Sequence, residues 1–381
     1  MKILQVNKFF FLKGGAETYF FNLLDLLKKH GHKVFAFSQK NVKNFPSAEK
    51  GYFVSNLDLS KINFSLVKIL RIFWSGEAKK KMARIIKEKK PDLIHFHNIY
   101  HQLSPSVLIP AKKAGVPTVM TVHDFKLIRP EYTLRADGKK TKGSFVRFLL
   151  NLEFSFHHFL DVYQKNVDVF LAPSEFVKNQ LVKNGFKEKQ IQVLPLFLDL
   201  KKYDSISPVK GKYIVFFGRL DESKGVDVLI KAFNSLKTKT KLKIVGAGPE
   251  ENNLKKIANG NVEFTGFKSG NDLIRIIKGS LFAVFPSRVH ETFGLSILES
   301  FACFKPVIAT DVGAFPELIN EENGILIGVN KETQLAQAIS KLLSNPNKVK
   351  IMGASARKTA EKFSPEKHYQ KLEAIYKKLI Q

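Results

Sequence analysis

Short apolar runs alternate with amphipathic stretches along most of the chain, and this rhythm is the feature that most narrows its fold. The runs are rich in Val, Ile, Leu and Phe with little polar alternation, which suits strands covered on both faces. Helical patterns lie between them, for example at residues 16–30, 104–115, 226–236 and 333–343. Strand–helix alternation predicts an α/β protein with doubly wound parallel sheets. The strands are expected at residues 2–7, 33–38, 92–97, 117–123, 168–172, 192–195, 212–218, 241–246, 261–266, 282–286, 306–310 and 324–327.

The rhythm restarts after Pro208, and this restart divides the chain. At 381 residues the sequence is longer than one hydrophobic core usually allows. We expect a Rossmann-like domain over residues 1–198, a linker over 199–208 and a second such domain over 209–364. Two doubly wound domains that face each other leave a cleft at the carboxyl ends of their strands, where such folds bind ligands.

Composition narrows the class of protein further. Apolar residues make up 44% of the chain and charged residues 25%, which is typical of globular proteins and excludes collagen and coiled coils. Cys303 is the sole cysteine, so we expect a reducing compartment and an inert, packed thiol. No uncharged apolar run reaches the roughly 18 residues of a membrane-spanning helix. Lys8 and Lys13 interrupt the start of the chain, which argues against a signal peptide and for a cytoplasmic protein.

The chain is strongly basic. Lys and Arg number 62 against 34 Asp and Glu, a net charge of +28, which favours nucleic acid, anionic lipid or a phosphorylated substrate as partner. Compositional drift towards lysine is the alternative explanation. A nucleic-acid-binding protein is not expected, because helix-turn-helix, zinc-finger and RNA-binding motifs are missing.

One basic stretch suggests a membrane surface. Residues 79–90 carry Lys79, Lys80, Lys81, Arg84, Lys87, Lys89 and Lys90, and Phe73 and Trp74 precede them. Such a surface would dock on the anionic inner face of the plasma membrane, where lipid-linked acceptors lie. A solvated helix face is the other interpretation.

Residues 144–163 have the pattern of an aromatic helix. A stripe of this kind most often packs into a core, which is the interpretation that we adopt. A surface for lipid is the alternative. The side chains on the stripe are Phe145, Phe148, Leu149, Leu152, Phe156 and Phe159.

The first motif with chemical content follows the strand expected at residues 212–218. Arg219 and Lys224 lie on the loop between Gly218 and the next helix. Cations at the carboxyl end of a strand, before a helix N-terminus, are well placed for a diphosphate, and a guanidinium offers a planar fork to two oxygens. A solvated loop is the alternative if the motif is considered alone.

A second motif follows the strand expected at residues 282–286. Glu291 lies on the loop, Gly294 permits close backbone approach where a helix begins, and Glu299 comes about two turns after Glu291. Both carboxylates can therefore face one cleft, together with the free amides of the helix N-terminus. A carboxylate accepts two hydroxyl hydrogens at once, which fits a ribose diol or a sugar ring. Two surface glutamates are the alternative.

Together these motifs resemble the signature of the family 4 retaining glycosyltransferases. The match covers residues 218–225 and 291–299 and continues through 302–313 and 246–250. Residues 14–17, 121–124 and 363–368 resemble the family's glycine loop, its central histidine and the segment before its last helix. The resemblance implies the GT-B architecture of two facing Rossmann-like domains, with the helix over residues 365–381 returning to the first domain.

The resemblance also assigns roles to residues. Arg219 and Lys224 would neutralise the donor diphosphate. Glu299 would bind the ribose hydroxyls and Glu291 the hydroxyls of the donor sugar. His123 would lie beside the anomeric carbon, so His123 and Glu291 are the predicted catalytic residues. The other predicted donor-binding residues are Gly14, Gly15, Phe293, Gly294 and Leu295.

Histidines other than His123 do not indicate a metal centre. His95, His97 and His101 occupy alternating strand positions and a loop, which does not suit a metal site. For His123 itself, a structural histidine in the core is the alternative.

The family's chemistry sets the expected mechanism. The family retains the anomeric configuration, and we expect front-face attack in which the leaving diphosphate takes the acceptor's proton. The chain has no Asp-x-Asp motif, with which transferases of the other major fold hold a metal, and Arg219, Lys224 and the helix start supply positive potential instead. We expect metal-independent transfer, without cofactor, from a nucleotide-diphosphate sugar to a saccharide or lipid-linked saccharide in cell-surface polysaccharide or lipopolysaccharide biosynthesis.

One position departs from the family pattern, and one other enzyme fits the architecture. The family usually has glycine where this chain has Phe304, and a turn glycine often serves a positive φ that bulky residues adopt reluctantly. A nucleotide-sugar epimerase is the alternative enzyme. Isomerised donor formed without acceptor would identify it.

Overall fold

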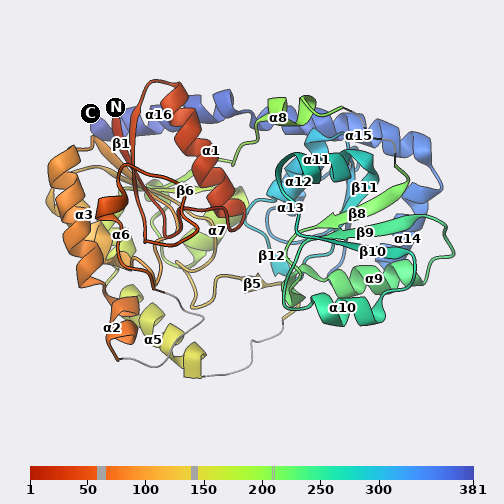
Figure 1. Cartoon of the computed structure of the whole chain (residues 1–381), viewed down its shortest axis with the longest axis horizontal. Coiled ribbons are helices and arrows are strands. Elements are labelled where there is room, and N and C mark those ends of the chain that lie inside the picture. Colours follow the sequence, from red (N-terminus) through yellow and green to blue (C-terminus); the bar gives the residue numbers. More distant parts are fainter. Residues whose placement is uncertain (58–65, 139–144, 208, 210) are drawn as a thin grey trace. The chain divides into compact units, whose positions relative to one another are not determined.

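The structure is a computed structural model that describes residues 1–57, 66–138, 145–207, 209 and 211–381. The chain divides into two compact units. Unit 1 comprises residues 1–132, 142–195 and 368–381, and unit 2 comprises residues 133–141 and 196–367. The chain therefore passes between the units four times, after residues 132, 141, 195 and 367, and both of its ends belong to unit 1 (Figure 1).

Unit 1 is built on a parallel sheet. Its described residues form six strands in the order β2–β1–β3–β4–β6–β7, and all neighbouring strands run parallel. Ile3, Ile94 and Phe96 are fully buried, as expected for strands covered on both faces. The bounds are β1 Lys2–Val6, β2 Lys33–Phe37, β3 Leu93–Phe96, β4 Thr118–Thr121, β6 Val169–Ala172 and β7 Ile191–Val193.

The last helix of the chain packs into unit 1. In α16 (Pro365–Ile380), the Tyr376 hydroxyl lies 2.6 Å from Nδ1 of His95, and Tyr369 stacks on His30 with 3.6 Å between ring centroids. The predicted return of this helix to the first half of the chain is confirmed. The other helices are α1 Gly15–Lys29, α2 Leu66–Phe73, α3 Gly76–Lys89, α4 Leu108–Lys113, α5 Phe145–Phe159, α6 Val162–Asn166 and α7 Glu175–Lys183, with 3-10 turns at Lys50–Tyr52, Pro105–Val107 and Glu188–Gln190.

Unit 2 repeats this plan. Its described residues form a second six-stranded sheet in the order β10–β9–β8–β11–β13–β14, again parallel throughout. The strands are β8 Tyr213–Phe217, β9 Lys241–Val245, β10 Val262–Gly266, β11 Ser280–Phe285, β13 Val307–Thr310 and β14 Gly324–Ile327. The helices are α8 Leu200–Asp204, α9 Val226–Asn234, α10 Glu251–Ile257, α11 Gly270–Gly279, α12 Leu295–Ala302, α13 Phe315–Leu318, α14 Glu332–Leu343 and α15 Pro346–Ala360, with 3-10 turns at Glu222–Lys224 and Glu361–Phe363.

A short antiparallel ladder joins two segments of unit 2 that are far apart in sequence. β5 (Leu134–Arg135) pairs with β12 (Val289–His290), and the amide of Ala136 donates to the carbonyl of Arg288 at 2.8 Å. Arg135 also pairs with Glu222, with 3.1 Å between nitrogen and oxygen. Two-residue strands show no apolar periodicity, so the sequence did not predict this ladder.

The helix predicted over residues 144–163 forms as α5 and α6, with Asp161 at a φ of 50° between them. Its apolar stripe does not pack into the core, and the core-packing interpretation is wrong. The side chain of Phe145 lies outside the described ones, and Leu149 is only partly buried. The exposed members of the stripe are Phe148, Leu152, Phe156 and Phe159.

Polar side chains hold the opposite face of α5 inward. Glu153 is buried, with Oε2 2.8 Å from Nζ of Lys126, and Oε1 lies 3.2 Å from Nδ1 of His101. Nε2 of His157 donates to the carbonyl of Phe73 at 2.7 Å. Burying a carboxylate without a cation costs more free energy than leaving a phenyl ring exposed to water. The orientation that satisfies Glu153 therefore turns the apolar stripe outward.

Candidate functional site

The loop after β8 holds the first predicted cations, and glycines allow it to contact the loop after β9. A Cβ on Gly246 would lie 1.9 Å from the carbonyl oxygen of Gly218. The amide of Leu220 donates to the carbonyl of Ala247 at 3.1 Å. This close backbone contact fixes the chain on both sides of Arg219. Residues 246–248 therefore support the site, which gives a structural reason for the glycines of this motif.

Arg219 and Lys224 have different surroundings. Arg219 is exposed, with Nε 3.3 Å from Oδ2 of Asp221. Lys224 is partly buried, and its Nζ lies 2.6 Å from Oε1 of Glu291. Burial opposes the charge of Lys224, but the carboxylate of Glu291 outweighs burial and raises the pKa of Lys224. Lys224 is therefore a cation held by a carboxylate in a partly buried place, whereas Arg219 is a cation at the surface.

Hydrogen bonds hold both the side chain and the backbone of Glu291. Ser287 Oγ donates to Oε1 at 3.0 Å, the same oxygen that contacts Lys224. The amide of Ala314 donates to the carbonyl of Glu291 at 2.9 Å. A Cβ on Gly313 would lie 2.3 Å from that carbonyl oxygen, so the segment after β13 presses against the backbone of Glu291.

The segment from Phe293 to Leu295 forms the start of α12. Gly294 caps the helix with a φ of 114°, a conformation that side chains rarely adopt. Phe293 is buried with its ring 5.6 Å from that of Phe363, so its backbone is what a ligand can reach. The first amides of a helix lack partners within the helix and carry its positive dipole end. This start can therefore bind an anion.

Glu299 lies on α12 and has a partner that no motif indicated. The hydroxyl of Tyr203, from α8, donates to Oε1 of Glu299 at 3.1 Å. Burial raises the pKa of Glu299 to about 7, although the Tyr203 hydrogen bond opposes this shift. The carboxyl of Glu299 thus titrates near neutral pH.

Arg288 is a support that sequence reasoning also missed. Its guanidinium donates to Oδ2 of Asp227 at 2.7 Å, to Oδ1 of Asn330 at 2.6 Å and to the carbonyl of Glu222 at 3.1 Å. It ties the loop after β11 to the turn that ends in Lys224. Its partners lie 42 to 66 positions away, so no local pattern could reveal the contact.

In unit 1, His123 follows β4 and bonds to a second histidine. Nε2 of His123 lies 3.0 Å from Nδ1 of His97, and Nε2 of His97 lies 2.8 Å from Oε1 of Gln5. The Gln5 oxygen only accepts, so His97 carries its hydrogen on Nε2 and accepts at Nδ1. His123 therefore donates from Nε2, which leaves Nδ1 as its unprotonated nitrogen. Burial and then Lys8 lower the pKa of His123 to about 3.

His95 connects the pair of His97 and His123 to the C-terminal helix α16. His95 stacks on His97 with 4.4 Å between centroids, and its Nε2 lies 2.7 Å from Oγ1 of Thr121. Its Nδ1 contacts Tyr376, as described above. The ring of Tyr19, on α1, lies edge-on to His123 with 5.4 Å between centroids. The Tyr19 hydroxyl lies 3.0 Å from Nε2 of His368, on α16. Helix α16 therefore helps to position Tyr19, which packs against His123.

Lys8 and two carboxyl groups that interact with it lie near His123. Lys8 follows β1, and burial lowers its pKa. Asp124 follows His123, and burial raises the pKa of Asp124 to about 6 against the opposing effect of Lys8. Burial likewise raises the pKa of Glu17, on α1. Perturbed titratable groups that gather in one place are typical of functional sites. Glu17 and Asp124 lie within the quoted segments 14–17 and 121–124, although neither was assigned a role, and Lys8 lies outside the motifs.

The structure places the predicted glycine loop at the start of α1. Gly14 precedes α1 in extended backbone at a φ of −171°, and Gly15 is the first residue of the helix. A Cβ on Gly14 would lie 3.8 Å from Oε2 of Glu17, an ordinary contact. Among the residues of unit 1 that the structure describes, therefore, no contact requires glycine at residue 14.

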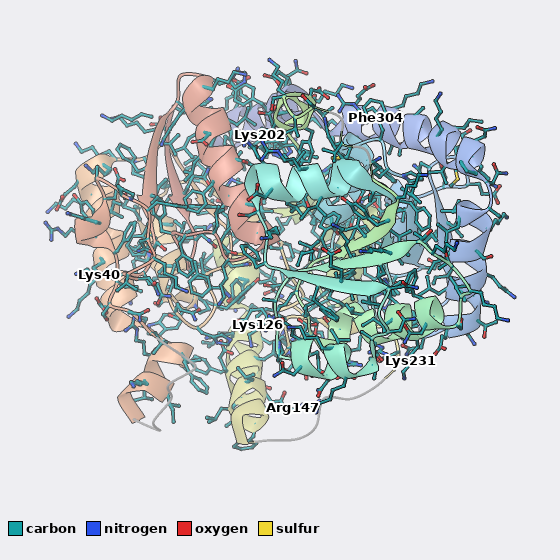
Figure 2. The ribbon with its side chains drawn as sticks, turned by 45° about the vertical axis from the view of Figure 1, so that its right-hand side comes forward. Lys40, Lys126, Arg147, Lys202, Lys231 and Phe304 are labelled. Carbon is teal, nitrogen blue, oxygen red and sulfur yellow. The ribbon has the colours of Figure 1, made fainter. Side chains whose placement is uncertain are left out.

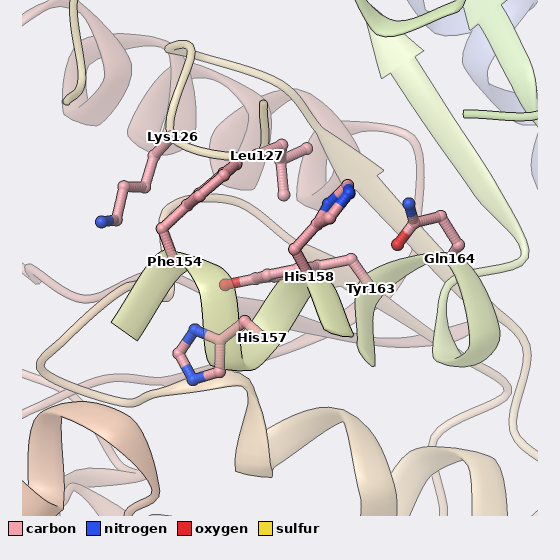
Figure 3. A pocket seen from close by; sticks show the side chains of 7 residues that line it. All are labelled: Lys126, Leu127, Phe154, His157, His158, Tyr163 and Gln164. Carbon is pink, nitrogen blue, oxygen red and sulfur yellow. The ribbon is translucent and has the colours of Figure 1, made fainter. Parts of the chain in front are cut away.

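Two hollows in the described residues lie away from these side chains. One, beneath the loop that carries Lys126, measures about 10 Å³ and is lined by Lys126, Leu127, Phe154, His157, His158, Tyr163 and Gln164 (Figure 3). It has room for about one water. The other, of about 740 Å³, lies beside Phe304 among Lys212, Lys305 and Lys350. None of the predicted donor residues lines either hollow.

Family models match both halves of the chain. Residues 13–202 match Glycosyltransferase Family 4, and residues 200–359 match glycosyl transferases group 1. The two parallel six-stranded sheets with their flanking helices match solved GT-B glycosyltransferases, so the fold is GT-B. The chain belongs to the family 4 glycosyltransferases of group 1 type.

Individual relatives agree with this assignment. The chain is 27% identical over 384 residues to an uncharacterised glycosyltransferase of Methanocaldococcus jannaschii, MJ1178, covering 100% of this chain and 99% of that protein. It is 24% identical to the N,N'-diacetylbacillosaminyl-diphospho-undecaprenol alpha-1,3-N-acetylgalactosaminyltransferase of Campylobacter jejuni, covering 88% and 89%. The structure of Anabaena HepE in complex with UDP-glucose superposes with a TM-score of 0.73 at 19% identity, covering 100% of each chain.

Two further findings concern metals and membranes. Among residues 1–57, 66–138, 145–207, 209 and 211–381, no three His, Cys, Asp or Glu side chains are grouped so as to hold a metal ion. In the same residues, no helix has the length and apolar character needed to span a bilayer.

Proposed function

We propose that the protein transfers a sugar from a nucleotide-diphosphate sugar to a saccharide or lipid-linked saccharide, with retention of configuration and without a metal. The observation that carries the donor assignment is the contact between Lys224 and Glu291, 2.6 Å apart. It joins a cation from one predicted motif to a carboxylate from the other, 67 residues later. One unit thus offers groups for both the diphosphate and the sugar of a single donor.

Each donor-binding residue has a chemical task under this proposal. Lys224 and the surface guanidinium of Arg219 neutralise the diphosphate, and the first amides of α12, at Gly294 and Leu295, donate to phosphate or sugar oxygens. Glu299 accepts from the ribose hydroxyls. Glu291 accepts from hydroxyls of the donor sugar, which positions the ring for reaction.

His123 acts as a neutral group in this mechanism. Its pKa of about 3 means that it carries no charge at neutral pH, so it cannot serve as a general acid there. We assign it to hydrogen bonding with the donor sugar through Nδ1, with His97 fixing that tautomer. Gly14 caps α1 in the same unit and Gly15 begins it, and we retain both as donor-loop residues.

The reaction that we propose is front-face displacement. The bond from the anomeric carbon to the diphosphate oxygen breaks, and the acceptor oxygen forms its bond on the same face. The acceptor's hydroxyl proton passes to the leaving diphosphate oxygen, so no protein base is consumed. Lys224, Arg219 and the α12 amides stabilise the negative charge that develops on the diphosphate.

The acceptor and the cellular place of the reaction are also proposals. The Campylobacter relative is named for a reaction on a diphospho-undecaprenol saccharide, which supports a lipid-linked acceptor. Two further features are compatible with it: the net charge of +28 and the basic helix α3. We therefore propose a role in cell-surface polysaccharide or lipopolysaccharide assembly at the cytoplasmic face of the plasma membrane.

Nucleotide release from a panel of UDP- and GDP-sugars tests the proposal. The parent would be compared with Glu299→Ala and Arg219→Ala, with and without EDTA, and direct binding of UDP and GDP would be measured in parallel. Lys231→Ala is a matched control, because Lys231 is an exposed cation on α9 of the same unit (Figure 2). We expect release from one donor, unaffected by EDTA and by the control, and reduced at least about 10-fold in both site variants.

Several results would contradict the proposal. Loss of activity in EDTA would overturn metal independence, and an inverted anomeric centre in the product would overturn the retaining mechanism. Isomerised donor without acceptor would establish the epimerase instead. If neither UDP nor GDP binds to the parent, the donor site itself is wrong.

A further inference from the structure

An apolar surface lies on the outside of unit 1 where α2 and α5 pack side by side (Figure 1). The rings of Phe73 and Phe156 meet there, with centroids 6.0 Å apart. We call this surface the α5 face. Its members and exposed fractions are Leu70 58%, Phe148 56%, Leu152 44%, Phe156 41%, Phe159 85% and Leu160 38%.

Helix α5 exposes this face because its polar side chains, and not its apolar ones, point into the protein. On an ordinary surface helix the apolar stripe points inward and polar residues face water. On α5, Glu153 and His157 point inward and are buried, with Glu153 engaged by Lys126 and His101. The Glu153–Lys126 pair is tied down further because Lys126 Nζ also donates to the carbonyl of Pro130 at 2.9 Å. A rotation that hid the stripe would break this buried pair, so the exposure of the stripe is built into the fold.

Basic side chains outnumber carboxylates on α2 and α5, although two of the three basic ones are paired with glutamates of neighbouring segments. Within α2 and α5, Lys68, Arg71 and Arg147 are the formally charged side chains besides Glu153, which is buried against its cation. Arg71 and Arg147 pair with Glu77 and Glu131 of neighbouring segments, at 3.9 Å and 3.3 Å. Arg147 lies on α5 itself (Figure 2). The next carboxylate after α5, Asp161, is paired with Lys165 at 3.4 Å.

The apolar side chains and the basic residues of the α5 face together indicate which class of partner binds there. Exposed apolar side chains gathered in one patch mark an interaction site. Large aromatic side chains beside basic residues, on a helix that lies flat on the protein, match the way helices bind at the interface of a bilayer that contains anionic lipid. A second copy of this chain would bring two basic faces of a +28 protein together, which electrostatic repulsion opposes.

We propose that the α5 face docks unit 1 on an anionic lipid bilayer, with Phe159 and Leu152 entering the headgroup region and with the basic side chains at the lipid phosphates. This docking gives the proposed function a place to meet a lipid-linked acceptor, and it rests on that function for its purpose only. The contact itself needs no donor, so it is measured without one. The location differs from the α3 surface expected from the sequence, since the apolar side chains lie on α5 and α2.

Vesicle flotation of the full chain tests the proposal. The probes are vesicles of phosphatidylcholine alone and vesicles of phosphatidylcholine mixed with phosphatidylglycerol. The test variant is Leu152→Ser with Phe159→Ser. The matched control is Phe267→Ser with Ile351→Ser, which makes the same kind of change at side chains of unit 2 that are 72% and 68% exposed.

The expected result is a difference between the two variants. The parent and the control float with the mixed vesicles and much less with phosphatidylcholine, and the α5 variant partitions about 10-fold or more less. Melting temperatures stay unchanged, because all four side chains are exposed. A parent that stays at the bottom of the gradient, or an α5 variant that floats as the parent does, would overturn the proposal.

Other outcomes would reassign the face. Equal flotation on both kinds of vesicle would overturn anionic lipid as the partner. A parent dimer in solution that the α5 variant dissociates would make the face an interface between two copies. Binding of UDP and GDP is measured on the same samples, so failure of the donor site and failure of membrane docking are told apart.

Discussion

Lys224 and Glu291 form an ion pair with 2.6 Å between Nζ and Oε1, although the diphosphate and the sugar are their separate partners in the proposed complex. In the absence of donor each of them satisfies the other. A bound diphosphate would give Lys224 a second anion and leave Glu291 free to turn to sugar hydroxyls. The pair therefore keeps Lys224 charged and both side chains in place until the donor arrives.

Replacing each partner alone separates the two roles. Lys224→Met removes the cation, and we expect affinity for whichever of UDP and GDP binds to fall by about 10- to 100-fold. Glu291→Gln keeps a hydrogen-bonding side chain, so nucleotide affinity stays within about 3-fold while turnover falls about 100-fold. Calorimetry and nucleotide release measure the two effects. Lys231→Met is the control, and equal loss of nucleotide affinity in both site variants would refute the division of roles.

Nucleotide binding is expected to depend on pH through Glu299. Its pKa of about 7 lies above the ordinary value, so the folded protein favours the protonated carboxyl and the unfolded chain does not. This group's contribution to stability is therefore present at acidic pH and is lost as pH rises towards about 7. Ribose hydroxyls favour the ionised form, so affinity rises with pH.

Calorimetry in buffers of different ionisation enthalpy, from about pH 6 to about pH 8, measures this effect. We expect proton release on binding near the pKa of Glu299. Glu299→Gln should abolish both the release and the pH dependence, while leaving weaker binding. Proton release that persists in Glu299→Gln would show that another group is responsible.

His97 is expected to act by positioning His123. His97→Leu removes the acceptor for Nε2 of His123, and we expect turnover to fall about 10-fold or more with nucleotide affinity unchanged. In His97→Asn, Oδ1 stands close to the position of Nδ1 and can accept the same hydrogen. Turnover should therefore recover in part, although both variants lose similar packing. Equal turnover in the two variants would show that His97 only fills space.

Phe304 is expected to strain its turn. It has a φ of 58°, the left-handed conformation that glycine adopts without cost, and its ring lies 5.2 Å from Cζ of Arg357. Phe304→Gly loses this cation–π contact but relieves the backbone, whereas Phe304→Ala loses the contact and keeps the strain. In urea denaturation we expect the glycine variant to be more stable than the alanine variant by about 1 kcal/mol. The reverse order would contradict strain at this turn.

The sequence predicted the two sheets well because buried parallel strands are continuous apolar runs. All twelve strands expected from such runs are present among the described residues, while β5 and β12 have two residues each and no such run. For α5, periodicity found the stripe but could not tell which face is inside. That depended on Glu153 finding Lys126, 27 residues away.

The chemistry of the candidate site was only partly predictable. Glycines and charged residues at strand ends indicated Arg219, Lys224, Glu291 and Glu299. Some of their contacts come from distant segments: Glu291 lies 67 residues after Lys224, and Tyr203 lies 96 residues before Glu299. Such contacts depend on how elements pack, which no local pattern records.

The four passages of the chain between its units have a consequence for synthesis on the ribosome. Unit 2 is complete in sequence once residue 367 has been made, whereas unit 1 needs residues 368–381. Until then His95 lacks Tyr376 and Tyr19 lacks His368. The half of the protein that is translated first therefore reaches its final packing last, once residues 368–381 are available. A nascent unit 1 would therefore expose its α16-binding surface to solvent throughout translation of unit 2.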